Sequence, residues 1–271
     1  MKLKEYIPSS LQSWRLGKKP ANGMLEGKKR IPVVASVKSF EPRLHLVHLA
    51  IRSVWNDEVV PQHTVLVLHQ KHRDSLPNSI KELEKVGLEI VFVDSDRSHF
   101  KLLGALSVHS SMPVVTFDDD VLYQKNWLNT LYKTHLQFPN QVVALQTRII
   151  SRSEKGDWLP YKNWPTSYRN QRSSLATLPI GGAGVLYPPN FNTPELSNVE
   201  LIERLCPKAD DLWFKTMGLL RSFEVVMPEV LPKSTLPIIS SQTVSLGKEN
   251  IKEDRNRSQW IDLCKHFNLK I

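Results

Sequence analysis

The chain has few cysteines and no long apolar segment. Its two cysteines, Cys206 and Cys264, lie far apart and outside any C-x-x-C pair, which argues against a disulfide framework or a thiolate metal site. We therefore expect reduced thiols, as in a cytoplasm. No run approaches the roughly 18–20 apolar residues of a membrane-spanning helix, and the stretch MKLKEYIPSSLQSWRLGKKP lacks the apolar core of a secretory signal. These absences predict a cytoplasmic protein.

Two common site patterns are also missing. The nine histidines include no H-x-x-x-H or H-E-x-x-H, so their spacing predicts no zinc site. The glycines of PIGGAGVLYPPN (179–190) do not form G-x-G-x-x-G, so a dinucleotide-binding fold is not supported. These glycines allow either a close approach of the backbone to a ligand or a tight turn.

What is present suits a globular protein with an uneven charge. The 271 residues, 41% of them hydrophobic, can bury a sizeable core, and the net charge is +9. Residues 1–30 carry a net charge of +6 and the other 241 residues carry +3. Such a basic arm favours peripheral contact with an anionic membrane over binding to nucleic acid, and a solvated tail explains it equally well.

The first half alternates between strand and helix patterns. Short apolar, β-branched runs predict strands, and apolar residues at helical spacing predict helices between them. The predicted strands cover 31–37, 63–69, 87–94 and 113–120, and the predicted helices 44–54 (behind Pro42), 77–86 and 99–109. This alternation predicts a largely parallel sheet flanked by helices, in which ligands gather at the carboxyl ends of the strands.

The second half is less regular. Residues 151–195 are rich in Pro, Trp, Tyr, Ser and Asn and show little periodicity. Helical spacing returns over 195–223, a last strand is expected over 223–232, and a terminal helix over 257–267. We expect this loop-rich half to shape specificity.

The run PVVTFDDDVL ends a predicted strand with three carboxylates. If the strand continues, Asp118 and Asp120 point to one side and Asp119 to the other. Two carboxylates converging at a strand end suit Mg²⁺ or Mn²⁺, with substrate phosphates and water as further ligands. The alternative is an acidic turn that caps the following helix.

A second acidic pair opens a predicted helix in KADDLWFKTMG. Asp210 and Asp211 can stabilise the helix N-terminus through its dipole, or supply a general base. The spacing favours neither. Aromatic residues in the loop-rich region suit sugar rings or core filling; they are Trp158, Tyr161, Trp164, Tyr168 and Tyr187.

Several of these segments, in this order, resemble one enzyme family. The resemblance rests on IPVVASVKSFEPRLHLVHLAIRSV, GLEIVFVDSDRSHFKLLGAL, VVTFDDDVLYQKNWL, PIGGAGVLYPPN and ADDLWFKTMG. Together they resemble the bacterial GT-A-fold glycosyltransferases, family-2-like, that build capsule or lipopolysaccharide glycans. The resemblance covers roughly residues 31–230 and implies a GT-A-type, Rossmann-like sheet.

The resemblance also implies a nucleotide-sugar donor, a UDP-sugar first, and Mn²⁺ or Mg²⁺. Asp118–Asp119–Asp120 would match the D-x-D motif, with Asp118 and Asp120 on the metal and Asp118 and Asp119 towards the nucleotide. In an inverting enzyme Asp211 would be the catalytic base, with Asp210 beside it. Further positions are expected at the nucleotide: Ser36, Ser39, Arg43, Lys101 and, near the base or ribose, Asp94.

The chain departs from the family pattern at two places. Lys38 stands in Ser36-Val37-Lys38-Ser39, where relatives often have S-L-T-S. Near the C-terminus, Asn256-Arg257-Ser258-Gln259 carries an arginine where relatives tend to have the acid of N-D-x-Q. These departures put the donor contacts and the role of the C-terminal element in question.

The sequence therefore predicts an enzyme with three parts: a basic arm (1–30), a GT-A catalytic domain (31–245) and a C-terminal loop and helix (246–271). Within the catalytic domain, 31–125 would bind the nucleotide sugar and 126–245 the acceptor. The predicted activity is metal-dependent, inverting transfer of a sugar to a surface glycan or lipid-linked glycan, at the inner face of the cell membrane.

Two rival functions remain open. FDDDVL also fits the first motif of haloacid-dehalogenase-type phosphatases, with Asp118 as nucleophile and Asp120 as acid, although that motif normally follows the first strand. A non-catalytic glycan-binding module could use the aromatic residues and the basic arm, but it would leave both acidic clusters without a role.

Overall fold

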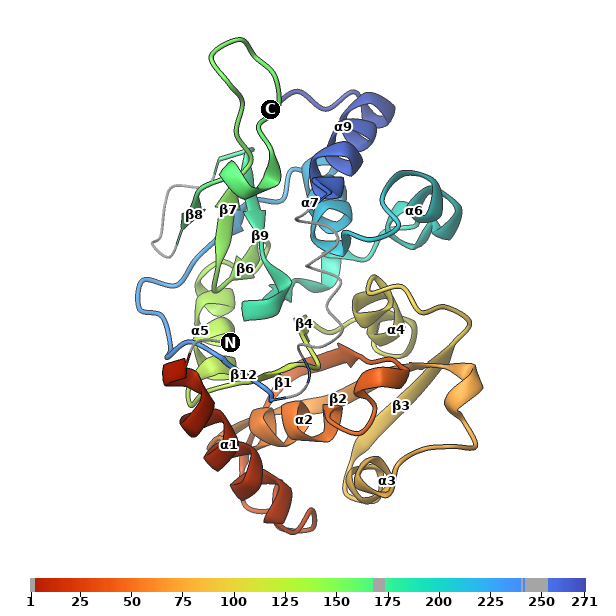
Figure 1. Cartoon of the computed structure of the whole chain (residues 1–271), viewed down its shortest axis with the longest axis vertical. Helices are drawn as coiled ribbons and strands as arrows, with labels where there is room; N and C mark the ends of the chain where they lie inside the picture. The colour runs from red at the N-terminus through yellow and green to blue at the C-terminus, as the bar shows by residue number, and fades with distance from the viewer. Residues whose placement is uncertain (1–2, 168–173, 240, 242–252) are drawn as a thin grey trace.

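The computed structural model describes residues 3–167, 174–239, 241 and 253–271. Its centre is a seven-stranded sheet in the order β11-β6-β10-β4-β1-β2-β3; Figure 1 labels β1, β2, β3, β4 and β6 of this sheet. Neighbouring strands run parallel except β10, which is antiparallel to both β4 and β6. The strands are β1 Lys29–Lys38, β2 Val59–His69, β3 Leu88–Val93, β4 Val114–Phe117, β6 Val142–Ala144, β10 Val185–Tyr187 and β11 Val225–Val226. A mostly parallel sheet in an α/β chain is thereby confirmed.

Helices cover both faces of this sheet. The α-helices are α1 Leu3–Lys18, α2 Val47–Trp55, α3 Asn78–Glu84, α4 Phe100–Val108, α5 Trp127–Gln137, α6 Val199–Leu205, α7 Asp210–Leu220 and α9 Arg255–Phe267. Short 3-10 helices are η1 Glu41–Arg43, η2 Gln70–His72, η3 Tyr161–Asn163, η4 Gly181–Ala183, η5 Pro189–Phe191 and η6 Glu195–Ser197. Two small sheets pair β5 Val121–Leu122 with β12 Leu236–Pro237, and β7 Thr147–Ile149 with β8 Thr166–Ser167 and β9 Thr177–Pro179.

Both faces of the central strands are buried. In β1, Val33, Ala35 and Val37 belong to the core under α1, α2, α3 and α5, whereas Val34 belongs to the core under α4, α6, α7 and α9. Because successive side chains point to opposite faces, a strand covered on both sides must be apolar at nearly every position. This explains why the strand segments appear as continuous apolar runs.

Strand β4 is shorter than its sequence predicts. It ends at Phe117, and Asp118, Asp119 and Asp120 lie in the turn before β5. The N–H of Asp118 donates to the hydroxyl of Tyr123 at 2.8 Å instead of continuing the ladder. The predicted strand over 113–120 is therefore corrected to Val114–Phe117, and strand alternation does not orient the three carboxylates.

The basic N-terminal segment does not extend away from the body as a free arm. Helix α1 contacts α2, and Leu16 is only 1% exposed. Ser9 Oγ donates to the carbonyl of Pro237 at 2.6 Å, and the guanidinium of Arg52 donates to the carbonyls of Leu16 and Lys19. Within the described part of the chain, no helix is both long and apolar enough to cross a membrane.

The last predicted strand is also short. Only Val225 and Val226 of the range 223–232 pair with the sheet, as β11. Pro228 and Pro232 follow, and proline cannot donate to a strand ladder.

The chain changes direction across the sheet between β1 and β4. From β1 it proceeds outwards through β2 to β3, and then returns to place β4 on the other side of β1. Val37 pairs with Phe117, so the residues that follow β1 and β4 leave the sheet side by side. Ligands bind preferentially outside the carboxyl ends of strands at such a switch point.

Candidate active site at the carboxyl ends of β1 and β4

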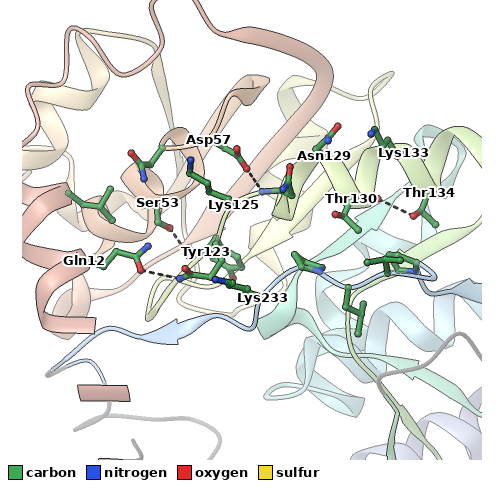
Figure 2. A pocket seen from close by; sticks show the side chains of 18 of the residues that line it. Gln12, Ser53, Asp57, Tyr123, Lys125, Asn129, Thr130, Lys133, Thr134 and Lys233 are labelled. Atoms are coloured by element: carbon green, nitrogen blue, oxygen red, sulfur yellow. Dashed lines mark hydrogen bonds between the residues drawn. The ribbon is translucent and has the colours of Figure 1, made fainter. Parts of the chain in front are cut away.

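One large cavity lies away from the acidic motifs. It has a volume of about 1210 Å³ and lies between α1, α5 and residues 228–233 (Figure 2). None of the predicted site residues lines it. Its cationic residues outnumber its acids, Asp57 and Glu229; they are Arg15, Lys19, Lys125, Lys133 and Lys233.

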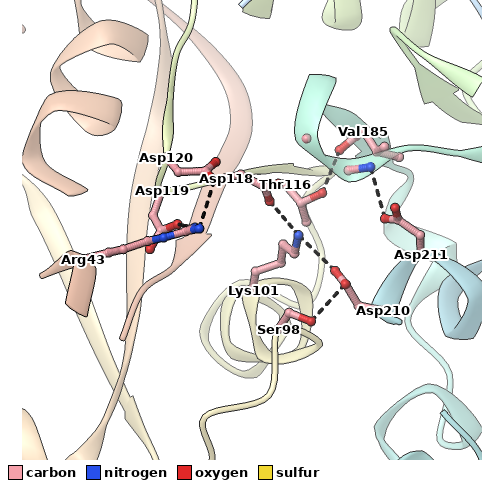
Figure 3. Close-up of polar contacts among 12 residues, drawn as sticks. Arg43, Ser98, Lys101, Thr116, Asp118, Asp119, Asp120, Val185, Asp210 and Asp211 are labelled. Atoms are coloured by element: carbon pink, nitrogen blue, oxygen red, sulfur yellow. Dashed lines mark hydrogen bonds and ion pairs between the residues drawn. The ribbon is translucent and has the colours of Figure 1, made fainter. Parts of the chain in front are cut away.

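The smaller cavity, about 320 Å³, opens at the switch point between β1 and β4. It is lined by residues from the loop after β1, the start of α4, the turn after β4, the start of α7 and α9. Seven predicted site residues beyond Ser39 line it: Arg43, Lys101, Asp118, Asp119, Asp120, Asp210 and Asp211 (Figure 3). The fold therefore brings the two acidic motifs into one site.

Arg43 pairs with two of the three consecutive carboxylates. Its guanidinium lies 2.7 Å from Asp119 Oδ1 and 3.1 Å from Asp120 Oδ2. Ser39 Oγ donates to the other oxygen of Asp119 at 2.6 Å. Burial raises the pKa of Asp119, although Arg43 and Ser39 act in the opposite direction. With 4% of its surface exposed, Asp119 fixes the turn to the loop after β1.

Lys101 joins the two acidic motifs. Its Nζ lies 2.8 Å from Asp118 Oδ1 and 2.9 Å from Asp210 Oδ2, and Ser98 Oγ donates to Asp210 Oδ1 at 2.9 Å (Figure 3). Burial alone would lower the pKa of Lys101, but the carboxylates of Asp118, Asp210 and Asp211 raise it well above its ordinary value. Burial would raise the pKa of Asp210, yet Lys101 lowers it. Both partners are thus held in their charged forms.

Asp211 differs from its neighbour. Its Oδ1 accepts a hydrogen bond from the Gly181 N–H at 3.1 Å. Burial and the adjacent Asp210 raise the pKa of Asp211 to about 8. The two carboxyls of the pair are therefore set apart, Asp210 ionised and Asp211 protonated near neutral pH, which is the pattern of an acid–base site.

The glycine-rich loop lets the backbone approach these carboxyls. A Cβ on Gly181 would lie 2.9 Å from Asp211 Oδ1, and one on Gly182 would lie 3.2 Å from Asp118 Oδ2. Gly184 has φ +109° and lies against Trp127, whose Nε1 donates to the carbonyl of Ala183 at 2.8 Å. Of the two roles left open for these glycines, the tight turn is observed, as the 3-10 helix η4, and its backbone closely approaches protein carboxyls and an indole ring. Close approach to a ligand stays a prediction.

Two predicted residues do not line the cavity. Ser36 is fully buried within β1. Asp94 follows β3 at the edge of the sheet; its side chain is 88% exposed and its nearest recorded partner is His69 at 3.5 Å. Neither residue lines the cavity, and both assignments to the nucleotide pocket stay predictions.

The cavity also contains residues that sequence patterns did not assign to the site. Asp96, Ser98 and Lys208 line it, and so does Lys38, the first departure from the family pattern, whose pKa burial lowers to about 8. Asp96 is two residues beyond Asp94, in the same acid-rich stretch after β3.

Helix α9 brings the altered C-terminal motif to the cavity. Asn256 is 9% exposed, and its Oδ1 makes no hydrogen bond within the described residues. Gln259 Oε1 accepts the backbone N–H of Lys208 at 2.9 Å, just before α7. Arg257, at the position of the family's acid, pairs with Asp254 at 2.7 Å. Asn256 therefore lines the cavity, and Gln259 bonds to the backbone of Lys208, which also lines it. Arg257 pairs with Asp254 and does not line the cavity.

Most of the aromatic residues considered for sugar binding serve the core. Trp164 and Tyr187 are 1% and 2% exposed, and Trp158 packs edge-on against Trp260. Tyr161 does line the cavity, and burial raises its pKa to about 12. Tyr168 lies outside the described residues.

The carboxylates of the D-x-D segment suit a hard divalent cation in chemistry and access. The side chains of Asp118 and Asp120 are 34% and 18% exposed, and both present carboxylate oxygens to the cavity. They do not converge as expected: Asp118 pairs with Lys101, whereas Asp120 shares Arg43 with Asp119. Arg43 and Lys101 thus supply the positive charge that these carboxylates require.

Comparisons with known proteins do not name a family. No protein-family model matches the sequence, and no curated protein matches it. Among solved structures, 4-diphosphocytidyl-2C-methyl-D-erythritol synthase from Anaerococcus prevotii overlaps 89% of this chain and 99% of its own, at 13% identity and a TM-score of 0.46. Similarity at this level carries no conclusion about activity, and the α/β assignment rests on the sheet itself.

Proposed function

We propose that this protein is a metal-dependent, inverting glycosyltransferase that moves a sugar from a nucleotide-sugar donor, a UDP-sugar first, to a surface-glycan acceptor. One observation carries the proposal. Lys101 contacts Asp118 and Asp210 at 2.8 and 2.9 Å, so the D-x-D segment and the ADD pair share one cavity at the switch point. Donor binding and proton abstraction then have their groups within one site.

The donor's diphosphate would lie against the cationic residues. Arg43 and Lys101 are buried and paired with carboxylates, so an incoming diphosphate would compete with Asp120 and Asp118 for them. Asp118 and Asp120 would then hold Mn²⁺ or Mg²⁺, which neutralises the diphosphate as it leaves. Ser39 and Asp96, on the loops after β1 and β3, support binding of the nucleoside on the same side of the cavity.

Asp211 is the proposed catalytic base. As a carboxylate it would take the proton of the acceptor hydroxyl, whose oxygen forms the new bond to the anomeric carbon as the bond to the nucleoside diphosphate breaks. A pKa near 8 suits this role, because a general base works best when its pKa lies near the operating pH. Lys101 keeps Asp210 ionised beside it, and this negative charge helps to raise the pKa of Asp211, so that the ionised Asp211 is a stronger base towards the acceptor hydroxyl.

The two halves of the chain support different parts of the substrate. Residues 31–125 supply the groups assigned to the nucleotide, and 126–245 supply Tyr161, Asp210 and Asp211 on the acceptor side. The C-terminal part, 246–271, adds Asn256 from α9. We retain this division as part of the proposal.

Helix α1 supports peripheral contact with an anionic membrane, where a lipid-linked acceptor would be found. Ile7, Leu11 and Trp14 recur at spacings of four and three and are 76%, 44% and 59% exposed. Lys18 Nζ lies 5.1 Å from the Trp14 ring, and the adjoining cavity is rich in cations (Figure 2). An apolar stripe with a basic border is typical of helices that lie in an anionic interface.

A thermal-shift screen with nucleoside diphosphates, with and without Mn²⁺, tests the proposal. A shift that needs both nucleotide and Mn²⁺ and is lost in Asp120→Ala, with the variant still folded, supports it. Asp211→Ala should abolish transfer and leave nucleotide binding nearly intact. No shift with any nucleotide, together with Mg²⁺-dependent release of phosphate from a simple ester, would replace the proposal with a phosphatase.

A further inference from the structure

Three side chains converge at the opposite edge of the sheet from the candidate active site. His63 Nδ1 lies 2.6 Å from Glu89 Oε1, and His109 Nε2 lies 2.6 Å from Glu89 Oε2. The two imidazole rings have centroids 4.0 Å apart and are tilted by 35°. One nitrogen from each ring and a carboxylate oxygen all lie within 4.8 Å of one another. Two imidazoles therefore share a single carboxylate.

The fold explains why these residues meet. Val65 of β2 pairs with Glu89 of β3, so His63 is the diagonal neighbour of Glu89 on the same face. This face continues through Val65, which lies in the core beneath α4. Helix α4 runs back across it and ends at its C-cap residue, His109. The cluster closes the open end of the layer between α4 and the sheet.

The donor set suits a borderline transition metal better than a hard cation. Zn²⁺ binds imidazole nitrogen and carboxylate oxygen tetrahedrally, and non-structural sites keep one position for water. In the metal-free protein each of these ring nitrogens lies at hydrogen-bond distance from Glu89; when the proton of each neutral imidazole is on the far nitrogen instead, three lone-pair donors face one another and a cation can lie between them. The side chains of Glu89 and His63 are 39% and 29% exposed, which leaves a path for entry and room for water.

We propose that His63, Glu89 and His109 bind a divalent transition metal, with Zn²⁺ as the best match. This site is separate from the Asp118–Asp120 segment and does not depend on the proposed function. It involves no residue that lines either cavity. Its spacing is invisible in sequence because the three ligands come from two strands and a helix end.

The metal would fix the helix that holds Lys101. Lys101 lies in the first turn of α4 and His109 caps its end, so the helix, about 13 Å long at 1.5 Å per residue, links the two sites. Gly104 lies against Val67 in between; a Cβ there would approach Val67 Cγ2 to 2.7 Å. With its centre packed so closely on β2, clamping the end of α4 at His109 restricts its tilt.

The test is calorimetric titration of EDTA-treated, dialysed protein with ZnCl₂, in an Asp120→Ala background that removes one carboxylate of the active-site segment. We expect one zinc ion per chain, and affinity at least tenfold weaker in Glu89→Gln and in His109→Gln. His266→Gln is the matched control, an exposed histidine in α9, and should bind as the parent does. Circular dichroism of each variant establishes that it is folded, and His63→Gln, on a strand and partly exposed, replaces any variant that is not.

Two further readouts separate a built site from loose binding to surface histidines. Zinc should raise the Tm of the parent and of His266→Gln but not of Glu89→Gln, and should slow amide exchange in α4. Equal zinc affinity in the parent, Glu89→Gln and His109→Gln overturns the proposal, as does the absence of zinc binding to the parent. Both outcomes are independent of nucleotide binding and leave the proposed function to its own test.

Discussion

The backbone N–H of Gly181 donates to Asp211 Oδ1 at 3.1 Å, and no Cβ fits between the two residues. A methyl group on Gly181 would lie 2.9 Å from that oxygen, so Asp211 must move in Gly181→Ala. If Asp211 is the base, we expect transfer to fall on the order of 100-fold, the effect of a misplacement of about 1 Å. Nucleotide binding should change little.

Gly23→Ala is the matched control, because a Cβ at Gly23 meets nothing within 4 Å. Transfer rates and nucleotide affinities of both variants are the measurement. Unchanged transfer in Gly181→Ala would show that the position of Asp211 does not limit the reaction.

The ionisation of Asp211 should appear in the pH dependence of stability. The unfolded carboxyl titrates near 4, whereas the folded protein holds the proton up to about 8. Between these values the folded state binds more protons than the unfolded state, so the contribution of this group to stability falls as pH rises and levels off above about 8. Asp211→Asn cannot ionise and should escape this loss.

We therefore expect the Tm of Asp211→Asn, relative to wild type, to increase between pH 5 and pH 9 by at least about 2 °C. Thermal denaturation across this range is the measurement. A constant Tm difference would mean that Asp211 titrates near its ordinary value in the folded protein.

Lys101→Met should affect stability and metal binding in opposite directions. The substitution leaves Asp210, whose side chain is 14% exposed, without its cation, and breaking a buried pair costs about 3–5 kcal/mol. Because Asp118 then loses a competing cation, we expect Mn²⁺ to bind more tightly and to restore part of the Tm. Chemical denaturation with and without Mn²⁺ measures both effects.

Arg97→Met serves as the comparison for Lys101→Met. The pair of Arg97 with Glu203 is 34% and 43% exposed, and such pairs contribute at most about 1 kcal/mol. A loss in Lys101→Met no larger than this would contradict the bridging role of Lys101.

The exposed stripe of α1 should govern membrane binding. The double substitution Ile7→Ser and Trp14→Ser removes two apolar side chains, each contributing about 1.5–3 kcal/mol when fully buried. We expect co-sedimentation of the double variant with vesicles rich in anionic lipid to be at least tenfold weaker than that of the wild type. Both the wild type and the double variant should bind only weakly to neutral vesicles. Leu136→Ser, at a leucine that is 61% exposed on α5, is the control. Equal loss in that control would remove any special role of α1.

Sequence patterns predicted the strands and helices whose own residues carry a clear apolar pattern. The runs at 31–37 and 63–69 identify β1 and β2 because both faces are covered and nearly every residue is apolar. Strands β6 and β10 contain three residues each, too few for any period to show. Helix α1 was missed because four of its larger apolar residues face outwards, so its periodicity does not describe a buried face.

Errors at the site arose from contacts between distant parts of the chain. The end of β4 depends on the hydroxyl of Tyr123, which no pattern in PVVTFDDD indicates. The orientation of the three carboxylates depends on Arg43 and Lys101, which arrive from other elements. The residue types alone could indicate which side chains are candidates for the site. Which carboxylate pairs with which cation could be known only from the order of the strands in the sheet.

The reversed direction of β10 has a consequence for how this site can diversify. Because β10 is antiparallel to β4, it begins at the edge of the sheet where the parallel strands end. The loop 181–184 therefore lies beside the residues that follow β4. A change of length in that loop would remodel the wall of the cavity without shifting the register of β1, β2 or β4. The part of the cavity formed by the loops after β1 and β4 could thus stay constant while the wall formed by the loop 181–184 changes in length.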